Sequence, residues 1–387
     1  MKWLPCFCLC CFGIFVLPSS TLAGDTGRFR DDVAVLFTQQ DRSATGRADA
    51  LAQQKSMFSS INKMYGDAEK FDATESNLHA MTEYVLSGGN PELAERFLER
   101  GGLPEKGAGI LLGAIHFMRG ERDHATKLLT GIDPLRLPPG LVGRIALVQA
   151  MLLADDDHRK LELLDIAIAA MPGTLVEESA LRRWVAAASV ADAAPHFWSR
   201  AARYLRRFSR SFYGVEFSGS LIGTIVSFEK RGQKVDQREI ELLFYELPAN
   251  RRRAAYLSLA RTSFADGFAG LVMFASRRAS RLSLEGSQEK SSSILYANLY
   301  GIAGEAADFS IGQLETVDAS ILGRRERLLL EAARSIAWRI RSPMTELLDE
   351  HNPAAKFDRG SPELNTMESS VDAALVAANR LLRDAMQ

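Results

Sequence analysis

Cysteine is almost absent from this sequence. Of 387 residues only four are cysteine, and all of them lie at the extreme N-terminus, at Cys6, Cys8, Cys10 and Cys11. Beyond Cys11 the chain cannot form a disulfide framework, a thiolate zinc site, an iron–sulfur cluster or a cysteine nucleophile. A chain of this length can bury a full core without disulfides, so the shortage does not prevent folding.

Net charge is nearly absent as well, because 47 basic residues and 48 acidic residues leave a formal charge of −1. Bulk nucleic-acid binding needs a positive field, so this balance excludes nucleic acid as a partner. The sequence also contains no GxSxG elbow, P-loop, HExxH helix or EF-hand loop. We therefore expect a protein that is not an enzyme and that uses no cofactor.

Metal-ligand patterns are weak. His116 and His124 flank one predicted turn, but a separation of eight residues is a poor spacing for a metal site. We interpret the histidines as surface or core residues and expect no metal site. The acidic run over residues 155–157, followed by His158, lacks the spaced oxygens of a calcium loop. We interpret it as a solvated loop that caps the next helix.

A long apolar run occurs only at the N-terminus. Lys2 precedes an apolar stretch over residues 4–17, and Thr21 and Ala23 supply the small residues of a cleavage site. This pattern predicts a secretory signal peptide over residues 1–23 that is cleaved after Ala23, with a retained N-terminal anchor as the alternative. No later segment approaches the roughly 20 apolar residues of a membrane span, so we expect no stable span after cleavage.

Apolar residues after the signal recur at spacings of three and four, which predicts helices from end to end. We expect an N-terminal helical hairpin over residues 24–66, with a polar turn over residues 41–46. A helical-repeat body over residues 67–342 follows. Residues 343–387 then form a polar linker and an amphipathic helix. This last helix either folds back on the body or binds a partner or a second copy.

Two helical hairpins in the body, over residues 110–129 and 141–171, resemble repeats. Pro138 lies 34 residues before Pro172, which is the period of tetratricopeptide repeats. Helical hairpins that recur at this period stack into a superhelix. The predicted fold class is therefore all-α, with helical hairpin repeats that form a tetratricopeptide-like α-superhelix.

Local signals also place helix ends. Asn90 is a preferred N-cap and Pro91 suits the first helical position, after a helix that stops at the glycines Gly88 and Gly89. The apolar spacing predicts further helices over residues 175–188, 195–208, 219–228, 237–245, 251–260, 268–278, 291–303, 311–318 and 322–340.

One predicted helix and the turn after it, over residues 195–210, separate an apolar face from a basic one. The apolar face carries Phe197, Ala201, Tyr204, Leu205 and Phe208. The basic face carries Arg200, Arg203, Arg206, Arg207 and Arg210. These arginines either pair with neighbouring acids as a solvated face, or form a surface that docks an acidic partner or an anionic envelope polymer.

Several segments suggest a family. The segment PGTLVEESALRR at residues 172–183 is the most specific of them, because twelve consecutive residues fit. Weaker similarity covers residues 39–54, 86–91 and 203–213. Together, over roughly residues 30–345, the chain resembles the MotC family of periplasmic motility proteins from rhizobia and their relatives.

The resemblance implies an exported, noncatalytic protein of the periplasm that acts in flagellar rotation. It implies as partner the periplasmic part of the stator protein MotB, of which the chain would stabilise one conformation. The alternative is a generic periplasmic tetratricopeptide-like scaffold for cell-envelope assembly. A third class, a peptidoglycan-active enzyme, has its nearest match in Glu178 and Ser179, but predicted helical repeats surround that pair.

Overall fold

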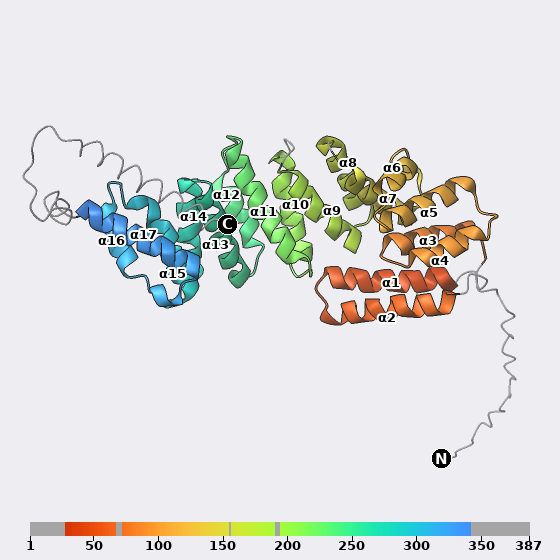
Figure 1. Ribbon diagram of the computed structural model, residues 1–387, viewed down its shortest axis with the longest axis horizontal. Coiled ribbons are helices and arrows are strands. Elements are labelled where there is room, and N and C mark those ends of the chain that lie inside the picture. Colours follow the sequence, from red (N-terminus) through yellow and green to blue (C-terminus); the bar gives the residue numbers. More distant parts are fainter. Residues whose placement is uncertain (1–27, 67–71, 155, 190–193, 342–387) are drawn as a thin grey trace, which may run out of the picture. The chain divides into compact units, whose positions relative to one another are not determined.

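The computed structural model describes residues 28–66, 72–154, 156–189 and 194–341, and each secondary-structure element in these ranges is a helix (Figure 1). The predicted signal peptide over residues 1–23 and the predicted linker and tail helix over residues 343–387 lie outside the described residues. Among the helices described, none combines the length and the apolar character needed to cross a membrane.

Contacts within the chain divide it into two compact units. Unit 1 comprises Met1–Gln40 and Asp49–Ile145, and unit 2 comprises Asp41–Ala48 and Ala146–Gln387. Two helices are divided between them, namely α1 (Arg28–Ala44) and α7 (Pro139–Leu152).

Unit 1 has a core of aliphatic side chains in which aromatic rings pack against one another. Its other helices are α2 (Ala48–Tyr65), α3 (Glu75–Leu86), α4 (Pro91–Glu99), α5 (Glu105–Met118) and α6 (Arg122–Leu129), with the 3₁₀ helix η2 (Pro134–Arg136). The ring of Phe29 packs edge-on against Tyr65 at 4.9 Å and against Tyr84 at 6.0 Å, which joins α1, α2 and α3. Helix α5 in turn contacts α3, α4 and α6.

The predicted helix end and start around residue 90 are confirmed. Gly88 follows α3 with a φ of +95°, a conformation that glycine adopts without strain. The Asn90 side chain accepts a hydrogen bond of 2.9 Å from the backbone N–H of Glu92, and Pro91 occupies the first position of α4. The cap satisfies an amide that has no partner within the helix.

Helix α1 is longer than its apolar pattern predicts. Most of the expected polar turn over residues 41–46 is helical, since α1 continues to Ala44. No glycine or proline interrupts the helix before Gly46, whose φ of +81° ends it. Asp41 also gains a partner distant in sequence, because its carboxylate accepts the backbone N–H of Leu175 at 2.8 Å. A negative charge at the N-terminus of a helix is stabilising, and Leu175 is the first residue of α9.

Unit 2 contains the longer run of helices, and each lies over a segment for which the apolar spacing predicts one. They are α8 (Asp157–Ala170), α9 (Leu175–Ala187), α10 (Ala194–Phe208), α11 (Gly214–Lys230), α12 (Gln237–Tyr245), α13 (Ala249–Ala265), α14 (Ala269–Leu282), α15 (Gln288–Asn298), α16 (Ala307–Glu315) and α17 (Arg324–Arg341), with the 3₁₀ helices η3 (Leu299–Gly301) and η4 (Ala319–Ile321). The Asp156 side chain accepts the backbone N–H of Arg159 at 2.8 Å and caps α8, as predicted for this acidic loop.

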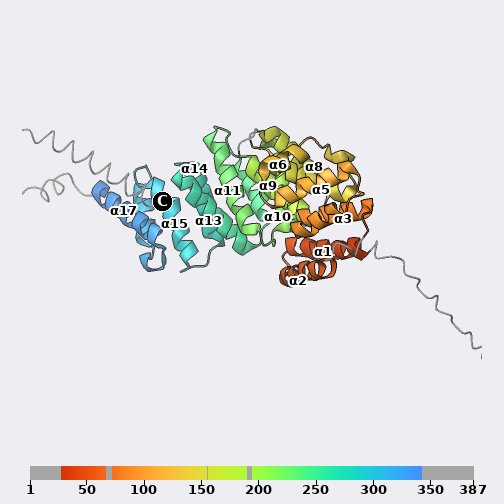
Figure 2. The same ribbon diagram turned by 45° about the vertical axis from the view of Figure 1, so that its right-hand side comes forward.

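Alternate helices of unit 2 pack against one another. Helix α9 contacts α11, α11 contacts α13, α13 contacts α15, and α15 contacts α17, while α10 contacts α12. Consecutive helices pack as well, notably α8 with α9 and α13 with α14, and Figures 1 and 2 show these helices following one another. Packing to the next helix and to the one after it is the arrangement of helical repeats. The prediction of an all-α helical-repeat fold is therefore confirmed, and the tetratricopeptide-like label stays a prediction.

Candidate functional site

The predicted basic face lies on α10 and on the turn that follows it. All five residues of the predicted apolar face are buried, namely Phe197, Ala201, Tyr204, Leu205 and Phe208. The ring of Tyr204 stacks on that of Phe217 in α11, with centroids 3.6 Å apart. The apolar half of the amphipathic prediction is thus confirmed, and the arginines are left on the opposite side of the helix.

Two of the arginines form ion pairs at the surface. Arg200 pairs with Asp165 of α8 at 2.7 Å. Arg206 pairs with Glu246, directly after α12, at 3.0 Å. Each of these pairs is in contact with solvent, so its contribution to stability is small, about 1 kcal/mol or less. Their main effect is to neutralise two of the five positive charges locally.

Arg203 and Arg207 hold a buried carboxylate. Glu177 of α9 is fully buried, and its carboxylate lies 2.5 Å from Arg203 and 3.1 Å from Arg207. The backbone N–H of Gly173, a residue with a φ of +87°, is the third group that donates to Glu177. A buried carboxylate is tolerated only when it is paired and hydrogen-bonded, so Arg203 and Arg207 compensate the burial of Glu177.

The neighbouring Glu178 is fully buried too. The hydroxyl of Tyr204 donates to its carboxylate at 2.6 Å, and the hydroxyl of Ser211 donates to it at 3.1 Å. Burial, and then the negative charge of Glu178, raise the pKa of Tyr204 far above its usual value. The tyrosine therefore stays neutral and remains a donor. Arg182 lies 3.6 Å from Glu178 and pairs with Glu216 at 2.6 Å.

Arg210 is the exception among the predicted arginines. Its side chain is exposed and makes no ion pair or side-chain hydrogen bond with any residue that the structure describes. Its backbone is fixed, because the turn at Gly46 approaches it so closely that a Cβ there would lie 2.1 Å from the Arg210 carbonyl oxygen. The guanidinium of Arg210 is thus an exposed positive charge next to a closely packed turn.

A surface cavity of about 260 Å³ lies between α10, α11 and α13. Its lining includes Tyr204, Ser211, Val215, Phe217, Leu221 and Arg251. Val215 is 87% exposed, and the nearby Phe212 and Tyr213 are also exposed. An apolar cavity lined by one arginine, Arg251, suits contact with another protein. Glu178, the nearest match to a catalytic acid, is buried behind it with its carboxylate hydrogen-bonded.

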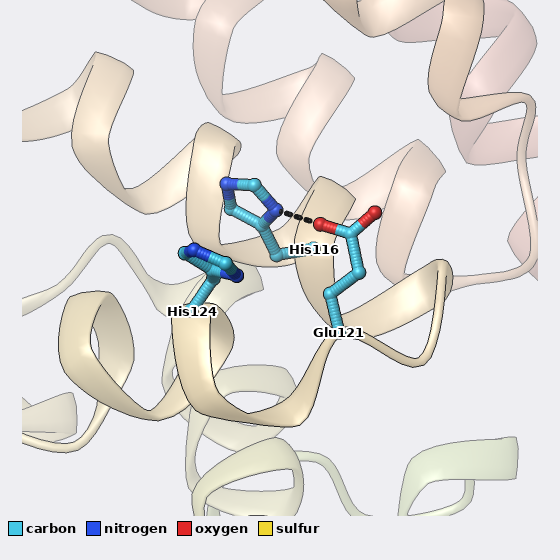
Figure 3. A group of neighbouring side chains, drawn as sticks. All are labelled: His116, Glu121 and His124. Carbon is cyan, nitrogen blue, oxygen red and sulfur yellow. Dashed lines mark hydrogen bonds and ion pairs between the residues drawn. The ribbon is translucent and has the colours of Figure 1, made fainter.

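The sequence interpretation missed one group of side chains in unit 1. His116 and His124 are eight residues apart, but the α5–α6 hairpin brings both next to Glu121 (Figure 3). The sequence shows the tight turn over residues 119–121, but only the folded hairpin shows that these three side chains meet. Spacing along the chain alone therefore does not show this cluster, and the expectation that these histidines bind no metal stays a prediction.

These observations define an all-α helical-repeat protein in which the carboxylates of the α9–α11 region are used for internal pairing. The family model described as Chemotaxis protein MotC matches residues 34–386. The chain is also 28% identical over 316 residues to the chemotaxis protein MotC of Rhizobium meliloti (strain 1021), which covers 79% of this chain and 71% of that protein. No solved structure matches the chain. The chain belongs to the MotC family, and its family is one of chemotaxis and motility proteins.

Proposed function

We propose that the chain is a noncatalytic motility protein that acts in the periplasm and is required for flagellar rotation. Its partner is the periplasmic part of the stator protein MotB. The observation that carries this proposal is the match of the MotC family over residues 34–386, which covers both units. The helical repeats of unit 2 support it, because stacked repeats present long surfaces suited to holding another protein.

The proposed mechanism is stabilisation of one conformation of the partner. A protein that binds one of two conformations tenfold more tightly shifts their equilibrium by about 1.4 kcal/mol. No covalent step is involved, so no reactive side chain is needed. This agrees with the buried, hydrogen-bonded state of Glu177 and Glu178.

We further propose that the partner docks where the basic face meets the cavity between α10, α11 and α13. Arg210 supplies an exposed charge there and Val215 an exposed apolar side chain. Arg203 and Arg207 contribute through Glu177, by fixing α10 against α9. The basic face thus has two parts, an internal one that stabilises the fold and an outer one available for contact.

Deletion of the gene tests the motility role. We expect paralysed cells that still carry assembled flagella, and normal rotation when the gene is restored. Envelope defects in cells that swim normally would contradict the proposal and favour a general scaffold for envelope assembly.

A pull-down tests the partner. The mature chain should retain the periplasmic domain of MotB and should not retain an unrelated periplasmic protein of similar charge. Retention of neither protein, together with a paralysed deletion strain, would keep the motility role and remove MotB as the direct partner.

A further inference from the structure

Three side chains with nitrogen or oxygen donors converge at the turn between α5 and α6 of unit 1 (Figure 3). His116 lies near the end of α5, Glu121 precedes α6, and His124 lies in its first turn. One ligand atom from each of the three lies within 4.8 Å of the others. We propose that His116, Glu121 and His124 bind a transition-metal ion of the Zn²⁺ type. This inference is independent of the proposed function.

The backbone holds the three residues together. Gly120 turns the chain with a φ of +77°, and the backbone N–H of Glu121 donates to the carbonyl of His116 at 2.9 Å. Helices α5 and α6 also pack against each other. The cluster is therefore fixed by a short, regular hairpin, and not by a loose loop.

The side chains already face one another. Nδ1 of His116 lies 2.5 Å from Oε2 of Glu121, and the imidazole rings of His116 and His124 are stacked with centroids 5.0 Å apart. Tetrahedral zinc has ligands at about 2.0–2.1 Å, which places the ligand atoms about 3.3 Å from one another. Zinc binding therefore requires Nδ1 of His116 and Oε2 of Glu121 to separate by about 0.8 Å and the imidazole of His124 to move closer. Glu121 and His124 are both exposed, so rotation of their side chains makes both adjustments without disturbing the core.

The donor set fits this type of ion. Two imidazoles and one carboxylate are the protein ligands of many zinc sites that keep one position open for water or for another ligand. Calcium and magnesium prefer oxygen ligands alone, so the histidines favour a transition metal. His116 is partly buried, which limits its motion, and the other two residues are open to an ion from solvent.

The neighbouring charges permit a cation. The charge of Arg119 acts on Glu121, but its guanidinium binds both carboxylate oxygens of Glu95, with Nη2 at 2.7 Å from Oε2. Its charge is therefore balanced by Glu95. Glu121 remains the acidic group that faces the two histidines.

Isothermal titration of the mature chain with ZnCl₂, without an affinity tag, tests the site. We expect one Zn²⁺ per chain and at least a tenfold loss of affinity in His124→Gln and in Glu121→Gln. His196→Gln, which changes an exposed histidine outside the cluster, is the control and should bind as the wild type does.

Substitution of Co²⁺ for Zn²⁺ gives a second measurement. A bound Co²⁺ ion should show the visible absorption of a four-coordinate site, and this absorption should be lost in His124→Gln. His124→Gln is at an exposed position, so its fold is expected to persist, and circular dichroism verifies this. A wild-type chain that binds Zn²⁺ no more tightly than His124→Gln would overturn the proposal.

Discussion

Glu177 links three parts of unit 2. It lies on α9, it is held by two arginines of α10, and it accepts the N–H of Gly173 in the turn before its own helix. Removing a charge from water is costly, and the cost is offset here by three hydrogen-bonding groups. A change at this residue therefore affects the junction of α9 and α10.

Replacement of Glu177 by glutamine should destabilise the protein. The amide keeps the size of the side chain but loses both ion pairs, and it places an NH₂ group against a guanidinium. Because Arg203 and Arg207 remain partly exposed and can be solvated, we expect a loss of about 2–3 kcal/mol, less than for a fully enclosed pair. Urea unfolding followed by circular dichroism measures it.

Glu162→Gln is the matched control for Glu177→Gln. Glu162 lies on α8 and pairs with Arg159 at 2.8 Å in contact with solvent. Its replacement should cost less than about 0.5 kcal/mol. Equal losses in the two variants would show that the buried ion pairs of Glu177 stabilise the fold no more than a surface ion pair does.

Tyr296 makes the stability of the protein depend on pH in the alkaline range. Burial, and then the negative charge of Glu326, raise the pKa of Tyr296 to about 12, whereas an unfolded tyrosine titrates near 10. Above pH 10 the unfolded chain loses this proton more readily than the folded chain does. The contribution of Tyr296 to the free energy of unfolding is therefore fully present below pH 10 and decreases as the pH rises toward 12.

The variant Tyr296→Phe isolates this effect. Between pH 8 and pH 11 the wild type should lose about 1 kcal/mol more free energy of unfolding than the variant does. Tyr245→Phe is the control, because Tyr245 is 74% exposed. If the wild type and Tyr296→Phe lose stability in parallel, the raised pKa of Tyr296 is wrong.

At the scale of the element, apolar periodicity carries most of the information. It predicts α10 and its buried face because the apolar positions recur on one side of the helix and need no knowledge of the partner helix. Capping at Asn90 is equally local, since donor and acceptor are two residues apart. The sequence therefore predicts where the helices of this fold lie and which face of a helix is buried.

The end of α1 and the pairing of the basic face are not predictable in this way. Asp41 stays helical while its carboxylate binds the amide of Leu175, a residue 134 positions later. Glu177 and Arg203 are 26 positions apart, on different helices. Such partners are set by tertiary packing, so the sequence shows a charged face without showing which charges are already paired. For the same reason the α5–α6 cluster becomes visible only in three dimensions.

For the whole molecule, a formal charge of −1 means that the field of the chain does not steer partners over long distances. Any electrostatic attraction must come from local charges, and at physiological salt these act over about 8 Å. Most of the basic face is neutralised by Asp165, Glu177 and Glu246. Recognition of an acidic partner therefore depends on exposed arginines such as Arg210, which stands in sequence between the cavity-lining Ser209 and Ser211.

Charge reversal at Arg210 tests this view. Arg210→Glu breaks no ion pair, so the fold should persist, while association with the periplasmic domain of MotB should slow several-fold at low salt. The difference from wild type should shrink as salt is raised, because screening removes the local field. Stopped-flow or surface plasmon resonance at several salt concentrations measures this.

Arg277→Glu is the matched control, since Arg277 on α14 is also exposed and, among the residues described, forms no ion pair. Both variants change the net charge of the chain by the same amount, so a general charge effect would slow both equally. Slowing of Arg210→Glu alone would place the contact at the α10–α11 turn. Equal association rates for the two variants would show that the basic face is not part of the partner surface. Its arginines would then serve only the fold, by pairing with Glu177 and fixing α10 against α9.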